Sequence, residues 1–220
     1  QFNDHFTLRA TGGTYYRLLN MYEIAGDGAG IWPMLNVDGT DSVFPMPEEG
    51  KQWDVSAIWD GKALGADTAK FQLTYFGRDS ENLLQLMSRN FFFFYTNAAK
   101  AKVNGLEIQA DMSWQKWDVN LQATYTKPKD VFYDMTKLPG YDSNTIAGSL
   151  TYQPQWEGTA RLTYRPDTNW SLFTQLRYVD WMVTDPIPLT TGAVKRQSSL
   201  TTMDVGVKYK FNKSLQLADR

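Results

Sequence analysis

The feature that most constrains the fold is a two-residue alternation of apolar and polar side chains, which recurs along most of the chain. In the clearest segment the apolar positions are Trp117, Val119, Leu121, Ala123 and Tyr125, and every residue between them is polar. A period of two is that of a β-strand with one apolar and one polar face. Similar segments lie near 6–17, 53–60, 71–75, 106–114, 159–164, 170–178 and 203–211, and a ninth begins near 215. Helical spacing is not seen over any useful length, so we expect an all-β protein.

The connections between these segments alternate between long and short. The predicted long loops are residues 18–50, a stretch carrying Pro128, Pro139, Gly140 and Pro154, and residues 179–199, and a medium loop is predicted at about 85–98. The predicted short turns are 61–67, 115–116, 165–169 and 212–214. Barrels of the bacterial outer membrane have short periplasmic turns and longer extracellular loops. The sequence therefore predicts a transmembrane antiparallel up-and-down β-barrel.

Aromatic residues, which make up 15% of the chain, gather at the ends of the predicted strands. Those beside the short turns are Trp114, Trp117, Tyr164, Trp170, Tyr209 and Phe211, and those at the opposite ends include Tyr16, Trp53, Tyr125 and Tyr178. Such rings form belts at both interfaces of a membrane. A soluble β-sandwich binding module also has alternating strands and is the alternative fold. The sandwich fold does not account for the alternation of long and short connections.

Composition argues against several functions. A net charge of −2 gives no basic surface for nucleic acid, and with no cysteine there is neither a disulfide framework nor thiol chemistry. An outer-membrane barrel enzyme, such as a protease or lipase, is an alternative, but His5 is the only histidine available for catalysis. We expect no cofactor or metal, because the oxygen-rich residues 36–41 lack the spacing of an EF-hand and are interpreted as a turn.

One stretch resembles a known family. Residues 97–108 read Asn-Ala-Ala-Lys-Ala-Lys-Val-Asn-Gly-Leu-Glu-Ile, which resembles the N-x-G-K-A-x-x-x-G-x-E stretch of TonB-dependent receptor barrels. Ala99 stands where that family often has glycine. Residues 73–83, 122–126 and 203–211 are similar to the same family, and the resemblance covers most of the chain from about residue 51 onward.

The resemblance, which is to siderophore receptors in particular, implies a 22-stranded barrel with an N-terminal plug inside it, located in the bacterial outer membrane. Residues 1–220 are then a partial barrel domain of about nine strands, without the plug and the last strand. The implied function is TonB-dependent active uptake of a scarce solute. The implied partners are membrane lipid, the TonB complex acting through the plug, and a small ligand such as a ferric siderophore. Vitamin B12, haem and an oligosaccharide are alternative solutes.

Two groups of residues are candidates for binding that ligand. The first is charged, on the predicted polar face near the outer strand ends, and comprises Arg17, Asp54, Arg78 and Arg177. Arginines there would attract an anion, although they could instead pair with one another or with the plug. The second is the apolar content of the loops, represented by Trp32 and Phe93. Exposed apolar clusters can bind ligands, and the alternative is that these rings pack the loops together.

Overall fold

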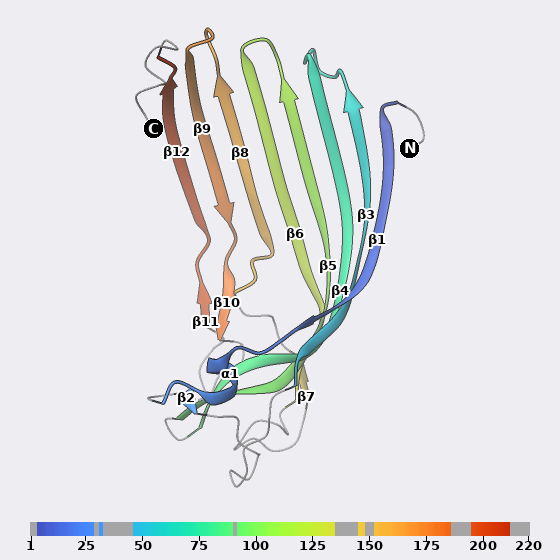
Figure 1. Cartoon of the computed structure of the whole chain (residues 1–220), viewed down its shortest axis with the longest axis vertical. Coiled ribbons are helices and arrows are strands. Elements are labelled where there is room, and N and C mark those ends of the chain that lie inside the picture. The colour runs from blue at the N-terminus through green and yellow to red at the C-terminus, as the bar shows by residue number, and fades with distance from the viewer. Residues whose placement is uncertain are drawn as a thin grey trace.

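A computed structural model of the chain describes residues 4–28, 31–32, 46–89, 92–134, 145–147, 152–185 and 195–211. Eight antiparallel strands form one curved sheet (Figure 1). They are β1 (Phe6–Arg17), β3 (Glu48–Gly61), β4 (Thr68–Arg89), β5 (Phe92–Ser113), β6 (Trp117–Asp134), β8 (Trp156–Tyr164), β9 (Trp170–Val179) and β12 (Leu200–Tyr209). Each strand pairs with the next of this series, which is the predicted antiparallel up-and-down arrangement. Within the described ranges, no helix is long and apolar enough to cross a membrane.

The smaller elements all lie in the predicted long connections, at the end of the sheet opposite the short turns (Figure 1). They are the short helix α1 (Met21–Ala25), the strands β2 (Ile31–Trp32) and β7 (Thr145–Ala147), and the hairpin of β10 (Met182–Asp185) with β11 (Lys195–Gln197). Strand β2 pairs in parallel with β5, and β7 pairs with β6, so parts of these connections are tied to the main sheet.

The strand register separates an apolar face from a polar face. Residues paired directly across antiparallel strands lie on the same face of a sheet. One such row reads Phe6, Trp59, Phe71, Ala110, Leu121, Ala160, Leu176, Met203. The row one residue away reads Thr7, Ile58, Gln72, Gln109, Gln122, Thr159, Arg177, Thr202. The alternation predicted from single strands therefore stays in phase across all eight.

The apolar face of the sheet is uncovered. The buried apolar residues of the described chain are all alanine or valine, whereas larger apolar side chains such as Met203 remain 64% exposed. The only other sheet among the described residues is the two-stranded β10–β11 hairpin. A soluble sandwich needs a second sheet packed on this face, so the sandwich alternative is wrong. An apolar face of this extent suits contact with lipid.

Aromatic side chains form two rows on the apolar face. In β6, β8 and β9 the two rows are eight residues apart, from Trp117 to Tyr125, Tyr164 to Trp156 and Trp170 to Tyr178. Rings of neighbouring strands meet within each row, with centroids 4.3 Å apart for Trp117 and Tyr164 and 4.6 Å apart for Tyr125 and Trp156. Eight residues extend about 27 Å along a strand, or about 21 Å along the barrel axis at a tilt of about 40°. This height is close to the apolar band of about 25 Å that such barrels carry.

Two predicted loop boundaries are wrong. Residues 85–98, expected to be a loop, largely continue β4 and β5 into a long hairpin, and β6 continues through Pro128 to Asp134. Bulges make both extensions compatible with the sheet. The register shifts between Ser80 and Leu84, where Asn82 has a φ of 55°, and again just beyond Pro128. The predicted turn at 36–41 and the start of a ninth strand near 215 lie outside the described residues.

Candidate ligand-binding surface

A hollow of about 860 Å³, here called the polar groove, lies on the polar face over β1, β3, β4 and β5. Its lining includes Asp54 and Arg78, two of the predicted ligand-binding residues, together with Arg9, Glu48 and Glu107. Register explains the grouping, because Ser56 and Thr74 pair in one row, Asp54 and Phe76 in the next, and Gln52 and Arg78 in the one after. The polar groove therefore crosses successive rows of one face.

Arg78 is held against a tyrosine. Its Nε donates a hydrogen bond of 2.9 Å to the hydroxyl of Tyr15, and its guanidinium carbon lies 4.3 Å from the centroid of that ring. The Tyr15 hydroxyl also shares a short hydrogen bond with Ser80. A guanidinium over an aromatic face is stabilised electrostatically. Tyr15 thus fixes the position of the arginine at the polar groove.

The other polar groups of the groove form a connected chain. Gln72 donates to Thr74 at 3.1 Å, Thr74 shares a 2.9 Å hydrogen bond with the buried Ser56, and Arg9 donates to Ser56 at 3.5 Å. Asp54 accepts a short hydrogen bond from Thr11. The groove contains charges of both signs, so it is suited to a polar ligand held by several hydrogen bonds.

Arg17 lies at the outer end of β1 and forms ion pairs with two glutamates. Its Nε and Nη2 donate to both oxygens of Glu48 at 2.7 and 3.0 Å, and its Nη1 donates to Glu23 at 2.9 Å. Glu23 belongs to α1 and also closes a capping box with Asn20. Arg17, Glu23 and Glu48 are called the arginine cluster below. Because two carboxylates surround it, the Arg17 charge is compensated locally.

The arginine cluster lies beyond the outer aromatic row, since Glu48 precedes Trp53 by five residues on β3. Burial alone would raise the pKa of Glu48, but hydrogen bonds from Arg17 and from the Leu84 backbone N–H outweigh it, so this pKa lies below its usual value. The same hydrogen bond with Glu48 raises the pKa of Arg17 further above its usual range. Both groups are therefore held in their charged forms.

The remaining predicted residues are not brought to the polar groove. Arg177 is on the polar face and exposed, but it lies on β9, four strands along the sheet from Arg78. It makes no hydrogen bond or ion pair with another described residue. For Trp32 and Phe93 only the backbone is described, and there β2 pairs with β5; their side chains lie outside the described part of the structure.

Asn97 anchors the connection that leads into β3. Its side chain is buried, accepts from the Met46 N–H at 2.7 Å and donates to the Met46 carbonyl at 2.9 Å. It also donates to the carbonyl of Asn82 at 2.6 Å, at the β4 bulge. One amide thus satisfies backbone groups of two segments, which fixes residue 46 against the β4–β5 hairpin. Asparagine at the start of the resembling stretch was visible in the sequence, but this role was not.

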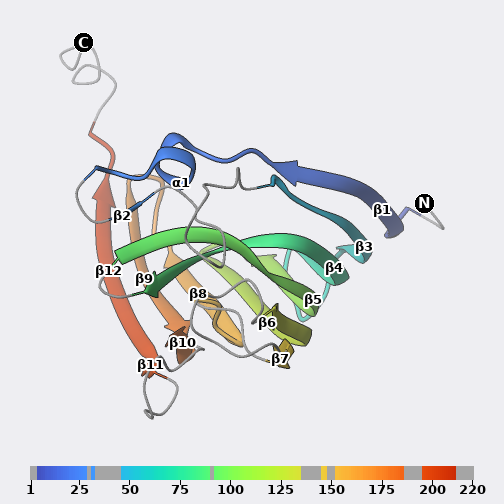
Figure 2. The same ribbon diagram turned by 90° about the horizontal axis from the view of Figure 1, so that it is seen from below.

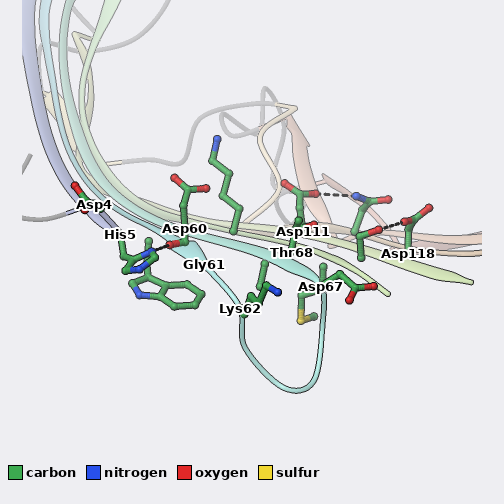
Figure 3. A pocket seen from close by; sticks show the side chains of 15 residues that line it. Asp4, His5, Asp60, Gly61, Lys62, Asp67, Thr68, Asp111 and Asp118 are labelled. Carbon is green, nitrogen blue, oxygen red and sulfur yellow. Dashed lines mark hydrogen bonds between the residues drawn. The ribbon is translucent and has the colours of Figure 1, made fainter. Parts of the chain in front are cut away.

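A second hollow of about 920 Å³, the rim pocket, lies at the short-turn end of the polar face (Figure 3). Its charged lining comprises Asp4, Asp60, Asp67, Asp111 and Asp118 with the lysines Lys62 and Lys70. His5 donates from Nδ1 to the Asp60 carbonyl at 2.7 Å, and Asn120 donates to Asp111 at 2.8 Å. The rim pocket is acidic, so an anionic solute is better accommodated by the arginines farther out on the same face.

Sequence reasoning did not single out Arg9, Tyr15 or Glu107 as site residues. Alternation placed Arg9 and Glu107 on the polar face, but which rows they share depends on the cross-strand register. The described residues contain no group of three or more His, Cys, Asp or Glu side chains able to hold a metal ion. The arrangement offers binding by hydrogen bonds and charge.

Comparison with known families decides what kind of protein this is. The family described as "TonB dependent receptor-like, beta-barrel" matches residues 1–218. The chain belongs to the TonB-dependent receptor family. Members of this family are outer-membrane receptors and transporters, which confirms the predicted location and makes the enzyme alternative wrong. No curated protein matches the chain.

Solved structures of two metal transporters and a siderophore receptor share the fold. The copper transporter OprC has a TM-score of 0.67 at 18% identity, over 96% of this chain and 30% of that one. The FrpB iron transporter from Neisseria meningitidis has a TM-score of 0.66 at 16% identity, over 96% and 31%. The siderophore receptor PirA from Acinetobacter baumannii has a TM-score of 0.64 at 14% identity, over 97% and 34%. The chain thus spans about a third of the length of these proteins.

Proposed function

We propose that this chain is the wall and outer-loop portion of a receptor that takes up a ferric siderophore by TonB-dependent transport. The family match over residues 1–218 carries the transport part of the proposal. The siderophore part is supported by the siderophore receptors and iron transporters among the similar structures. A plug and the remaining strands would belong to the same polypeptide, in keeping with relatives about three times as long.

In this proposal the outer half of the polar face contacts the ligand. Arg78 and Asp54 would meet it in the polar groove, and Arg177 would meet it from four strands farther along the wall. Arg17 would act by holding the outer connection through its ion pairs. Trp32 and Phe93 would supply apolar contact from the loops. No bond is made or broken; TonB, acting through the plug, would supply the energy for release.

The test is binding and uptake by the full-length receptor. Ferric catecholate and ferric hydroxamate siderophores would be titrated against the purified receptor, with tryptophan fluorescence as the signal. We expect one class to bind, and uptake of the 55Fe-labelled complex to stop in cells lacking TonB. If the receptor binds copper, haem, vitamin B12 or an oligosaccharide and neither siderophore, the siderophore part of the proposal is wrong and the transport part stands. Uptake that persists without TonB would overturn the transport.

Substitutions then test whether the predicted arginines contribute to ligand binding. Arg78→Gln and Arg177→Gln should each weaken binding about tenfold, the loss of roughly one charge-assisted hydrogen bond. Arg165→Gln is the matched control, because Arg165 lies in the short turn at the other end of the sheet. Equal ligand affinities for all three variants would show that Arg78 and Arg177 do not contact the ligand.

A further inference from the structure

The apolar face contains a hollow that contact with bulk lipid does not require. It measures about 560 Å³ and lies over β6, β8, β9 and β12, and we call it the membrane-face groove. Its walls are Trp117, Leu162, Tyr164, Leu172, Val205 and Val207. These residues belong to two adjacent rows, in which Trp117 pairs with Tyr164 and Leu162 with Thr174.

The groove exists because short side chains lie between large ones. Thr174, Val205 and Val207 are short, whereas the stacked pair of Trp117 and Tyr164 stands beside them. Phe173 and Gly206 also line the groove, but they pair in a polar-face row, so only their backbone contributes to its floor. The Phe173 ring packs over Gly206 instead and leaves the space open.

The depth of the groove is set by the aromatic row at the short turns. Trp170 and Tyr209, with centroids 4.6 Å apart, are two residue pairs nearer the turns than Leu172 and Val207. Tyr209 also meets Phe211 edge-on at 4.9 Å. Tryptophan and tyrosine favour the headgroup level of a bilayer, so the groove begins at that level and leads into the hydrocarbon.

Basic residues follow or precede the aromatic residues at the short-turn end of the groove in the sequence. Lys116 precedes Trp117, Arg165 follows Tyr164, and Lys210 lies between Tyr209 and Phe211. The turns are adjacent, since the Arg165 N–H donates to the Lys116 carbonyl at 2.8 Å. Arg165 forms an ion pair with Asp118. Lys116 is exposed and forms no ion pair with another described residue. Lys210 continues the polar-face alternation of Gly206 and Lys208, so it is not counted among the charges at the groove.

We propose that the membrane-face groove is a specific site for one anionic phospholipid. An acyl chain would fill the groove between the aromatic pairs, and the phosphate would lie beside Lys116. Apolar lining, position on the lipid-facing surface and charge complementarity all select this occupant. A basic residue near a membrane surface attracts anionic lipid. The site does not depend on which solute the receptor carries.

The test uses the full-length receptor with two lipids that share acyl chains, phosphatidylglycerol and phosphatidylcholine. After mild delipidation in detergent, native mass spectrometry would count the lipid retained as each is titrated. We expect one phosphatidylglycerol per receptor, bound about tenfold more tightly than phosphatidylcholine. Equal retention of the two lipids by the wild type overturns the proposal.

Two pairs of variants locate the site. Val207→Trp fills the groove and should abolish the retained lipid, whereas Val55→Trp makes the same change on the apolar face of β3 and should not. Lys116→Gln leaves the apolar walls unchanged and should remove the preference for phosphatidylglycerol. Lys62→Gln, in the β3–β4 turn, is its control. The proposed site is wrong if the two tryptophan variants retain the same amount of lipid. It is also wrong if the lysine variant still prefers phosphatidylglycerol to phosphatidylcholine.

Discussion

At the residue scale, the sheet repeatedly places an aromatic ring of one strand over a glycine of the next. Phe76 lies over Gly105, Trp53 over Gly77 and Phe173 over Gly206, so close that a Cβ on each glycine would lie within 3 Å of the ring. Glycine is a poor strand residue, because it has no side chain to pack and loses more entropy on folding. The ring covers the gap, which offsets that cost. These glycines therefore make room for the packed rings, and they do not indicate that a strand ends there.

Gly105→Ala should destabilise the receptor by about 1–3 kcal/mol, because overpacking displaces well-packed neighbours. The new Cβ would meet the Phe76 ring and would lie 2.7 Å from the Tyr125 carbonyl oxygen, which belongs to the backbone. Gly13→Ala is the matched control, since it is also a polar-face strand glycine and has nothing within 4 Å of the added atom. Guanidinium unfolding of both variants in lipid vesicles measures the difference. Equal midpoints would show that the Phe76 contact does not constrain this position.

At the scale of elements, the arginine cluster joins segments that the sheet alone would not hold together. Arg17 belongs to β1, Glu23 to α1 and Glu48 to β3, and Glu48 also accepts a 2.9 Å hydrogen bond from the Leu84 N–H of β4. The cluster thus fixes the start and the end of the connection between β1 and β3. Asn97 acts on the same connection from β5 through Met46. Figure 2, seen from the loop end, shows α1 and β2 lying beside the outer part of the sheet.

The stability that Glu48 contributes should depend on pH. Its pKa in the folded protein lies below the usual value of 4.5, so the stabilisation is fully present above pH 4.5 and is lost as pH falls through the lower, folded value. Glu48→Gln should therefore cost about 1–3 kcal/mol at pH 7 and progressively less below pH 4.5. Urea unfolding of both proteins across this range measures the gap. Glu49→Gln removes the neighbouring carboxylate outside the cluster, and a gap that narrows equally in this control would contradict the assignment to Glu48.

At the scale of the whole molecule, the architecture was predictable from sequence because it rests on local patterns. Alternation gave the eight described strands and their faces, and loop lengths gave the two ends of the sheet. Cross-strand register was not predictable, and it decides which polar side chains lie beside one another. The contact of Arg78 with Tyr15 was therefore missed. The extension of β4 and β5 was missed because bulges carry no reliable sequence signal. The carboxylate partners of Arg17 were missed because both fall within residues 18–50, which the sequence predicted as a long loop without periodicity.

The two aromatic rows define where the middle of the membrane should fall. Leu121 lies on the apolar face of β6, four residues from Trp117 and four from Tyr125, so it is placed at the midplane. Gln122 is adjacent in sequence but belongs to the polar face. If this assignment of faces and depth is correct, an arginine should be tolerated at one of these positions and not at the other.

Leu121→Arg should cost about 2–4 kcal/mol, the penalty for arginine on the lipid face at the midplane. Gln122→Arg should cost far less, because its charge would remain on the polar face. The same substitution at Val119 or Ala123, two residues from the centre, should cost less than at Leu121, since the penalty falls toward both interfaces. Unfolding free energies in phosphatidylcholine vesicles, measured for the full-length receptor, test this order. Equal penalties at positions 121 and 122 would mean that the sheet does not present one face to lipid, and a maximum away from 121 would place the midplane elsewhere between the two aromatic rows.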